Sequence, residues 1–187
     1  MKIIKLVITF IMCKLFHIQY HRGQWIHPSV RIRRNRDDVI QMGYGVVLHK
    51  GVRLDISGGV VKIGNGCSIN TFSRIESGSM VELEDNVLIG PNVYISDRNH
   101  EYKDVNIPVM YQGYYSKGNI KIGEGTWIGI HAAIIGNVAI GKGCVIGANA
   151  VVTSDIPDYS VVVGNPGIVV KRYDDNSKRW ERVSNHI

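Results

Sequence analysis

The sequence predicts an all-β fold, a solenoid of short parallel strands, from three observations. Over residues 122–152 an aliphatic side chain recurs at every sixth position without a miss. Glycine follows four of these six residues, and a small or slightly branched residue stands four places after each of the first five. Repeats of this length are the signature of a parallel β-helix. The six aliphatic positions are Ile122, Ile128, Ile134, Ile140, Ile146 and Val152.

Each hexad is expected to form one side of a triangular coil, as a short strand followed by a tight turn. One residue on each side points to the axis and must be apolar. Glycine follows it where a side chain would clash or force an unfavourable φ. Three hexads close a coil of about eighteen residues, so each coil buries its aliphatic side chains against the next one. A helical fold is excluded, because apolar residues do not recur three and four places apart and the chain contains 21 glycines.

The same phase continues upstream in three shorter runs. Small insertions near Gly58-Gly59 and Gly78-Ser79 separate the runs, and insertions in a solenoid map to corner loops on one face. We therefore expect one β-helix domain over residues 23–170, long enough to bury a full core. The runs are Met42, Leu48 and Leu54, then Ile63, Ile69 and Ile75, then Leu83, Ile89 and Ile95.

The phase is lost from Asp97 to Asn119 and resumes at Ile122. A stretch of this length inside a compact repeat is usually functional. It opens with Asp97-Arg98-Asn99-His100 and is rich in tyrosine. We therefore predict an excursion loop over residues 97–119. Its tyrosines are Tyr102, Tyr111, Tyr114 and Tyr115.

The three cysteines indicate no disulfide framework. Cys67 and Cys144 occupy the small position of their hexads, so both are expected to be thiols packed inward, and Cys13 stands alone near the start. This usage favours a reducing compartment, the cytoplasm.

Residues 1–22 are expected to form a separate helical segment. The apolar run Leu6–Cys13 is too short to span a bilayer, and no small-residue cleavage site follows it. We expect the helix to pack on the end of the β-helix or on a neighbouring subunit. The alternative is a helix lying on the inner membrane face, helped by its lysines. The predicted packing face consists of Ile4, Ile8, Ile11, Leu15 and Ile18.

The formal net charge is +6, with basic clusters at Arg31–Arg36 and Lys171–Arg182. A nucleic-acid partner is not expected, because no reading motif or aromatic platform accompanies the charge. A polyphosphate ligand, an anionic lipid and an anionic glycan explain it equally well. The basic tail, residues 171–187, is expected to be a short helix.

Several motifs resemble those of the hexapeptide-repeat acyltransferases, over roughly residues 36–175. The resemblance implies a left-handed parallel β-helix that works as a homotrimer with acetyl-CoA. Ile95–His100 and the tail from Lys171 to Arg182 look most like bacterial surface-polysaccharide O-acetyltransferases. The motifs are the Ile-Gly hexads, Thr126-Trp127-Ile128-Gly129, Ile146–Val152, Asp155-Ile156-Pro157 and Gly164-Asn165-Pro166.

The resemblance implies that His100 is the catalytic histidine. O-Acetylation needs a base that takes a proton from a sugar hydroxyl as it attacks the thioester carbonyl, and the pKa of histidine suits this task. Asp97 has two roles open to it: it either fixes the imidazole tautomer by a hydrogen bond or caps its own turn by a bond to its own backbone. His49 and His131 lie at outward positions of hexads and are expected to be surface residues.

The acceptor and donor sites follow from the same resemblance. Asn70 aligns with an asparagine that lines the acceptor site of similar galactoside-type enzymes. Gly78 stands where those enzymes carry an acceptor-binding aspartate, so the acceptor differs here. The CoA-contacting lysine that often follows Thr153 is replaced by Ser154. The implied CoA-binding residues are Gly129, Ala148, Thr153, Lys171 and Arg172.

We therefore predict an acetyl-CoA-dependent O-acetyltransferase acting on a sugar hydroxyl of a surface polysaccharide or its precursor, cytoplasmic or peripheral on the inner face of the membrane. No covalent acyl-enzyme and no metal are expected. The alternative is acetyl transfer to another acceptor: an amino sugar, serine or an antibiotic. A γ-carbonic-anhydrase-type zinc enzyme requires two closely spaced histidines, and His100 has no such partner in its loop. A purely structural solenoid needs neither the His100 loop nor the basic tail.

Overall fold

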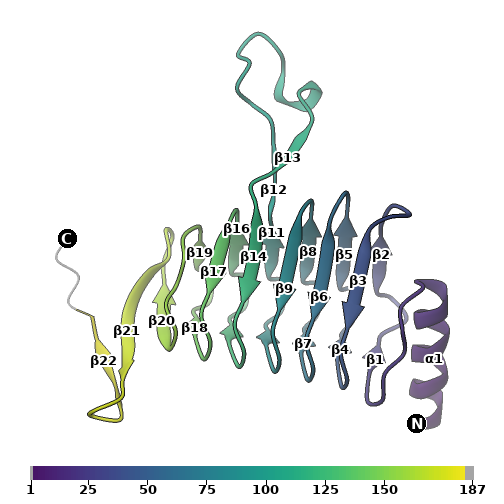
Figure 1. The fold of residues 1–187 in the computed structure, drawn as a ribbon, viewed down its shortest axis with the longest axis horizontal. Coiled ribbons are helices and arrows are strands. Elements are labelled where there is room, and N and C mark those ends of the chain that lie inside the picture. The colour runs from purple at the N-terminus through teal and green to yellow at the C-terminus, as the bar shows by residue number, and fades with distance from the viewer. Residues whose placement is uncertain (1, 184–187) are drawn as a thin grey trace.

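The computed structural model describes residues 2–183 and shows a parallel β-helix of about six turns (Figure 1). Each coil adds one short strand to each of three sheets, which form the three faces of the solenoid. One helix closes the N-terminal end, and a two-stranded hairpin projects from the side. The predicted parallel β-helix is thus confirmed.

We name the three sheets A, B and C. Sheet A contains β1 (Trp25–Ile26), β4 (Val47–Leu48), β7 (Ser68–Ile69), β10 (Leu88–Ile89), β15 (Trp127–Ile128), β18 (Val145–Ile146), β20 (Ser160–Val163), β21 (Ile168–Asp174) and β22 (Arg179–Arg182). Sheet B contains β2 (Arg31–Arg33), β5 (Arg53–Ile56), β8 (Arg74–Ser77), β11 (Tyr94–Ser96), β16 (Ala133–Ile135) and β19 (Val151–Val152). Sheet C contains β3 (Val39–Met42), β6 (Val60–Ile63), β9 (Met80–Leu83), β14 (Asn119–Ile122) and β17 (Val138–Ile140).

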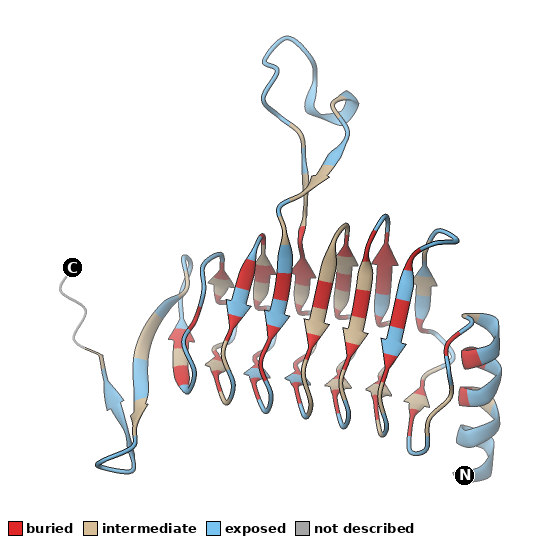
Figure 2. Cartoon of the chain, in the orientation of Figure 1, coloured by how far each residue is buried: buried red, intermediate tan, exposed pale blue. Residues whose placement is uncertain are grey.

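The hexad aliphatics form ladders along the axis of the solenoid. In sheet B, Leu54 pairs with Ile75, Ile75 with Ile95, and Ile95 with Ile134, and all four side chains are completely buried. Sheets A and C carry equivalent ladders, drawn as the buried stripe along the strands in Figure 2. Every aliphatic position identified from the period is buried, so the repeat alone determines which side chains form the core.

Close packing between coils accounts for the glycine that follows several of the aliphatic residues. A Cβ atom on Gly129 would lie 2.8 Å from the backbone nitrogen of Ala148 in the next coil. The left-handed backbone conformation falls two residues later, at His131, which has φ 60° and is exposed as expected. Gly129 is therefore required by the spacing between coils and not by its own φ.

The insertions all map to one corner, between sheets B and C, as the sequence predicts. The segments around Gly58 and Gly78 each join a sheet B strand to a sheet C strand. The excursion of residues 97–119 leaves from the same corner, between β11 and β14. It is a hairpin and not an irregular loop: β12 (Arg98–His100) pairs antiparallel with β13 (Tyr114–Ser116), and a 3₁₀ turn, η1 (Val109–Tyr111), lies near its tip.

Helix α1 (Lys2–Leu15) packs against β1 and closes the N-terminal end of the solenoid, but not with the predicted face. Its buried residues are Thr9, Met12 and Cys13. Of the predicted packing residues, Ile18 is buried beyond the helix and Ile8 packs partly, whereas Ile4, Ile11 and Leu15 are exposed.

A polar residue faces inward on α1 because the first strand is a sheet edge. The backbone N–H of Ile26 in β1 donates to Thr9 Oγ1 at 3.3 Å, and the Thr9 hydroxyl donates to the Lys5 carbonyl. If an isoleucine took the place of Thr9, the N–H of Ile26 at this sheet edge would have no hydrogen-bond acceptor. The need for an acceptor thus rotates the helix away from the orientation that hydrophobic spacing predicts.

The helical prediction for the basic tail is wrong, and residues 184–187 lie outside the described part. β21 pairs antiparallel with β20, and β22 pairs with β21. Asp174 Oδ1 accepts the backbone N–H groups of Asn176 and Ser177, which fixes the turn, and the rings of Tyr173 and Trp180 pack across the hairpin at 5.6 Å. A β-branched run, Ile168–Val170, opens β21 and favours a strand over a helix.

Candidate functional site

A cavity of about 700 Å³ lies on the outer face of sheet B, at the root of the projecting hairpin. Four arginines and two carboxylates contribute to its wall beside His100. Its lining residues include Arg33, Arg34, Asp55, Arg74, Glu76, Tyr94, Arg98, Asn99, His100 and Tyr114.

His100 is the last residue of β12, so the hairpin sets its position. Its backbone N–H donates to Asn99 Oδ1 at 3.0 Å, and its imidazole packs on the Tyr114 ring with centroids 4.2 Å apart. The Arg98 guanidinium lies over the same tyrosine ring, 4.8 Å from its centroid. The residue is exposed, which leaves the imidazole accessible from the cavity.

Asp97 caps a turn of the preceding coil and not its own turn, so its contacts match neither of the two predicted roles. Its buried carboxylate accepts hydrogen bonds from the backbone N–H of Gly78 at 2.6 Å, the N–H of Ser79 at 3.0 Å and the Ser77 hydroxyl at 3.2 Å. Asp38 makes the same pair of backbone bonds at another turn of this corner. Asp97 thereby anchors the root of the hairpin that carries His100.

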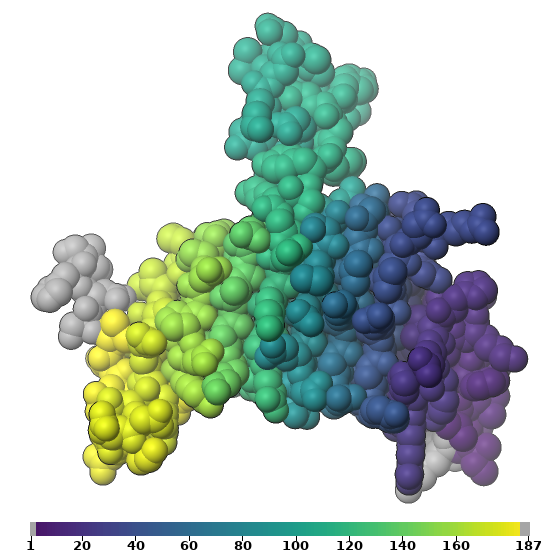
Figure 3. Space-filling view, in the orientation of Figure 1, coloured from purple at the N-terminus to yellow at the C-terminus, as the bar shows by residue number. Residues whose placement is uncertain are grey.

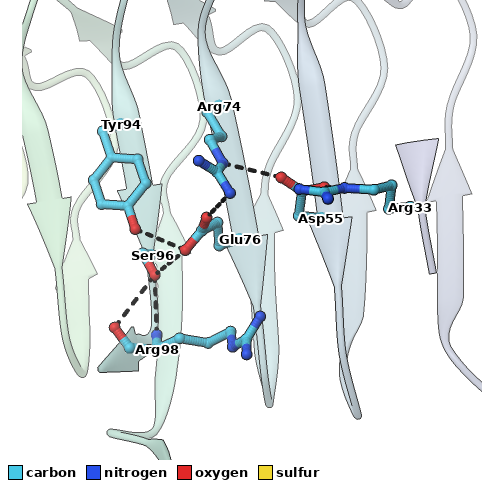
Figure 4. Close-up of polar contacts among 7 residues, drawn as sticks. All are labelled: Arg33, Asp55, Arg74, Glu76, Tyr94, Ser96 and Arg98. Carbon is cyan, nitrogen blue, oxygen red and sulfur yellow. Dashed lines mark hydrogen bonds and ion pairs between the residues drawn. The ribbon is translucent and has the colours of Figure 1, made fainter. Parts of the chain in front are cut away.

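A network of ion pairs crosses sheet B beneath the cavity (Figure 4). Asp55 accepts from Arg33 Nε at 2.6 Å and from Arg74 Nε at 2.9 Å, and Arg74 also pairs with Glu76. Burial acts to raise the pKa of Asp55, but the hydrogen bond from Arg33 and the charge of Arg74 outweigh it and hold that pKa below its usual value. Asp55 therefore stays ionised and holds both arginines over the sheet.

The network ends beside the hairpin, at Tyr94 and Ser96. The Tyr94 hydroxyl donates to Glu76 Oε2 at 2.7 Å, and burial raises the pKa of this phenol, so it remains a donor. None of these residues was predicted from the sequence. A signal that could have found part of the network is the charged or polar residue directly after the inward aliphatic in the first four strands of sheet B, namely Arg33, Asp55, Glu76 and Ser96.

The implied CoA and acceptor residues lie at a different corner. Asn70, Gly129 and Ala148 follow strands of sheet A, at the corner between sheets A and B, and Gly129 and Ala148 are neighbours in successive coils. Asn70 Oδ1 accepts the backbone N–H of Thr71 at 2.7 Å, a bond that stabilises its own turn. Within one chain these residues and His100 occupy opposite ends of the sheet B strands.

Thr153 and the two cations of the tail lie near the C-terminal end of the solenoid. Thr153 follows β19 and is exposed. Lys171 and Arg172 are exposed neighbours on β21, opposite Arg182 and Glu181 of β22. Because successive side chains of a strand point to opposite faces, the two cations leave the hairpin on opposite sides.

Cys67 and Cys144 are buried thiols, as the hexad phase predicts, and Cys13 on α1 is buried as well. Burial raises the pKa of Cys67 to about 11 and also raises the pKa of Cys144. A thiol that stays protonated is a weak nucleophile. Within residues 2–183 no group of three or more His, Cys, Asp and Glu side chains is arranged to hold a metal ion.

Comparison with known proteins adds to this geometry. A family model for bacterial transferase hexapeptide repeats matches residues 119–154. A putative lipopolysaccharide biosynthesis O-acetyl transferase of Escherichia coli, WbbJ, is 30% identical over 155 residues, 79% of each chain. The chain belongs to the hexapeptide-repeat acyltransferase family. A probable acetyltransferase of Mycobacterium tuberculosis is 41% identical over 164 residues, but the chain spans only 46% of that relative's length.

Solved structures agree with the family's left-handed β-helix. The N-acyltransferase AntD from Bacillus cereus, crystallised with a dTDP-amino sugar and coenzyme A, superposes with a TM-score of 0.75 at 22% identity, over 90% of this chain and 91% of AntD. The acetyltransferase domain of PglB from Neisseria gonorrhoeae, bound to acetyl coenzyme A, gives 0.57 at 27% identity, over 79% and 57% of the two chains. The superpositions support the β-helix fold, and the hexapeptide repeat fits the predicted left-handed form.

Proposed function

We propose that this protein transfers an acetyl group from acetyl-CoA to a sugar hydroxyl of a surface polysaccharide or its precursor. The observation that carries the proposal is the similarity to the lipopolysaccharide O-acetyl transferase, which extends over 79% of both chains. The PglB domain, at 27% identity, binds acetyl-CoA, which supports the same donor here. The cavity beside His100 supplies a place for the acceptor.

In the proposed step His100 removes the proton from the acceptor hydroxyl, while the oxygen of that hydroxyl attacks the thioester carbonyl of acetyl-CoA. The tetrahedral intermediate collapses with release of CoA thiolate, which takes up the proton held by His100. Direct transfer agrees with the buried, protonated state of Cys67 and Cys144. The acetyl group thus passes from sulfur to oxygen by addition and elimination, without an acyl-enzyme.

Transfer to an amino sugar is the second candidate, because AntD and a GDP-perosamine enzyme of Caulobacter crescentus, both similar in fold, are N-acyltransferases. Treatment of the acetylated product with mild alkali separates the two reactions, since esters are hydrolysed and amides persist. Release of labelled acetate is expected. Retention of the label after alkali would overturn O-transfer in favour of N-transfer.

We propose that the active unit is a homotrimer. The support is that His100 and the implied CoA corner lie at opposite ends of sheet B, so that a second copy has to bring them together. The hairpin also projects from the body (Figure 3) and exposes more apolar surface than an isolated loop needs. Its exposed large hydrophobics are Tyr102, Val105, Ile107, Val109, Met110, Tyr111 and Tyr114.

Light scattering is therefore expected to give about three times the 20.9 kDa chain mass. Shortening the hairpin by residues 103–112 should shift the protein toward monomer and abolish turnover, because the apolar tip is lost. A monomeric full-length protein with normal turnover would refute the trimer.

We propose that CoA binds along the corner formed by Gly129 and Ala148, with Thr153 contacting the arm and one of the two tail cations contacting the phosphates. Because Lys171 and Arg172 leave β21 on opposite faces, only one of them meets CoA directly. Lys171 matches the basic residue that the family resemblance assigns to CoA. Lys171→Ala should therefore raise the KM for acetyl-CoA roughly 10-fold, with a smaller effect on kcat. Arg172→Ala is the matched control, and dephospho-CoA should abolish the difference between wild type and Lys171→Ala.

We propose that α1 also makes a peripheral contact with the anionic inner face of the membrane. Residues 1–36 carry 8 of the 22 Lys and Arg residues and none of the 16 acidic residues. The outward side of α1 is apolar, and no described helix has the length and hydrophobicity to cross a bilayer. Exposed apolar residues beside cations suit a lipid surface. They are Ile3, Ile4, Leu6, Val7, Phe10, Ile11 and Leu15.

Changing both Ile4 and Ile11 to serine is expected to weaken co-sedimentation with phosphatidylserine-containing vesicles on the order of tenfold or more, because both side chains leave the lipid. The thermal midpoint should stay constant, since both residues are exposed. Met12→Ala, on the packed face, should instead lower the thermal midpoint. Ile168→Ser, at the other end of the solenoid, is the control for vesicle binding. If the Ile4 and Ile11 double variant lost its oligomeric state but still bound vesicles, the proposal would be contradicted.

A further inference from the structure

The arginines of the sheet B cavity differ in how far their charges are already neutralised. Asp55 engages Arg33 and Arg74 with its two carboxylate oxygens, and Glu76 is divided between Arg74 and Tyr94. These contacts use both carboxylates of the cavity wall. The network is therefore a finished structural unit that does not need a ligand.

Two further guanidinium groups in the same wall have no carboxylate partner among residues 2–183. Arg34 donates to the backbone carbonyl of Asp38 at 2.6 Å, and Arg98 lies over the ring of Tyr114. With four arginines and two carboxylates, the wall carries a net charge of +2 beside His100. Figure 4 shows Arg98 extended from its strand toward the side on which Arg33 lies.

The position of Arg98 is built into the backbone beneath it. A Cβ atom on Gly78 would lie 2.9 Å from Arg98 Cγ, so the arginine stem can pass this closely over the turn only because residue 78 is glycine. The backbone N–H groups of Gly78 and Ser79 are held in turn by Asp97, the residue before Arg98. The sequence thus places the Arg98 stem against a position that carries no side chain, and its guanidinium over the Tyr114 ring.

The cavity also continues toward the N-terminal end of the solenoid. A second cavity of about 810 Å³ shares Arg33, Arg34 and Asn35 with the first one. Beyond this shared wall it is lined by Leu15 and Phe16 at the end of α1. A ligand whose anionic group sits among the arginines therefore has room on both sides, toward His100 and toward α1.

We propose that the acceptor is a diphosphate-linked sugar whose diphosphate binds Arg34 and Arg98 in this cavity. The inference rests on the proposed acetyl transfer at His100 and adds the class of acceptor. Two guanidinium forks without counter-charges match a group that carries two or more negative charges, and arginine binds phosphate oxygens in a bidentate manner. The sugar then points to His100, and the nucleoside or lipid carrier extends toward α1.

Binding of dTDP and of inorganic pyrophosphate to the full-length protein, measured by calorimetry, tests the site directly. Arg98→Gln and Arg34→Gln should each weaken binding roughly 10- to 100-fold. Gly78→Ala should weaken it as well, although it changes no charge, because the new methyl group displaces Arg98. Arg53→Gln removes the same charge from the same sheet outside the cavity and is expected to bind as wild type does.

Each variant must keep the wild-type thermal midpoint, which shows that it is folded. Arg98→Lys serves as a second variant if Arg98→Gln is unstable. Two further arms separate the sources of the diphosphate: a dTDP-hexose in solution, and a polyprenyl-diphosphate-linked sugar in vesicles. Tighter binding in either arm than to pyrophosphate supports the proposal and names the carrier. Equal binding by wild type and Arg98→Gln to every probe would overturn it.

The two proposals fail in different ways. His100→Ala should bind dTDP and pyrophosphate with unchanged affinity while losing turnover, so a binding result does not depend on the chemistry. Acetyl transfer to a neutral glycan by a protein that binds no diphosphate would refute the acceptor class and leave O-acetylation standing. Diphosphate binding that requires Arg34 and Arg98, in a protein that acetylates only amines, would support the site and refute O-transfer.

Discussion

Replacement of His100 by alanine is expected to lower kcat for acetyl transfer by roughly 10²- to 10⁴-fold, the usual contribution of a positioned general base. The affinity for acetyl-CoA should stay the same, because Gly129 and Ala148 lie at the other corner of sheet B and no implied CoA residue lines the cavity beside His100. Turnover is followed by release of the CoA thiol, and donor binding by calorimetry. Added imidazole should restore part of the activity, since it can occupy the space left on the Tyr114 ring.

His49→Ala is the matched control for this experiment. His49 lies outside the cavity and contacts Ser68 only weakly, at 3.4 Å, so its loss should change neither kcat nor stability. A His100→Ala protein that turns over at the wild-type rate at neutral pH would contradict the base mechanism. An equal loss in both variants would contradict the assignment of the base to His100.

The fold could be predicted from the sequence because each hexad encodes its own geometry. An aliphatic such as Ile128 is buried by its counterparts in the neighbouring coils, Ile89 and Ile146, and these are specified by the same period. The corner insertions and the hairpin site follow from interruptions of that period. What the period does not cover is the two ends, where α1 and the β21–β22 hairpin meet a sheet edge and not another hexad.

The candidate site was only partly predictable, because its contacts join different coils. Arg33 and Asp55 are 22 residues apart and Asp55 and Arg74 are 19 apart, with an insertion between them that changes the spacing. The ion-pair network therefore becomes visible only when the coils are stacked in register. His100, in contrast, stands where the period breaks, and that break is visible in the sequence.

The same reason explains why the sequence did not predict the contacts that Asp97 makes. A hydrogen bond to His100 and a cap of its own turn both involve residues that are near in sequence, whereas the cap at Gly78 and Ser79 involves the preceding coil. The period predicts that coils stack, but not which side chain at a corner forms hydrogen bonds with the backbone of the neighbouring coil. The three bonds accepted by the buried carboxylate favour a positioning role, which has a distinct experimental signature.

Asp97→Ala is expected to lower the free energy of unfolding by about 3 kcal/mol, because two backbone N–H groups and one hydroxyl lose a charged acceptor in a buried place. Turnover should fall as well, since the root of the hairpin that holds His100 is no longer anchored. Chemical denaturation measures the first effect, and the KM for the acceptor and kcat measure the second. A residue that only fixes the imidazole tautomer would lower kcat without changing stability.

Asp38→Ala separates anchoring of the hairpin from stabilisation of the corner. Asp38 accepts the backbone N–H groups of Gly58, Gly59 and Asn35, also three bonds, but no hairpin leaves from its turn. Its loss should cost a similar amount of stability and leave kcat close to wild type at a temperature where both variants are folded. Equal stability of Asp97→Ala and wild type, with kcat reduced, would instead return Asp97 to the role of a partner for His100.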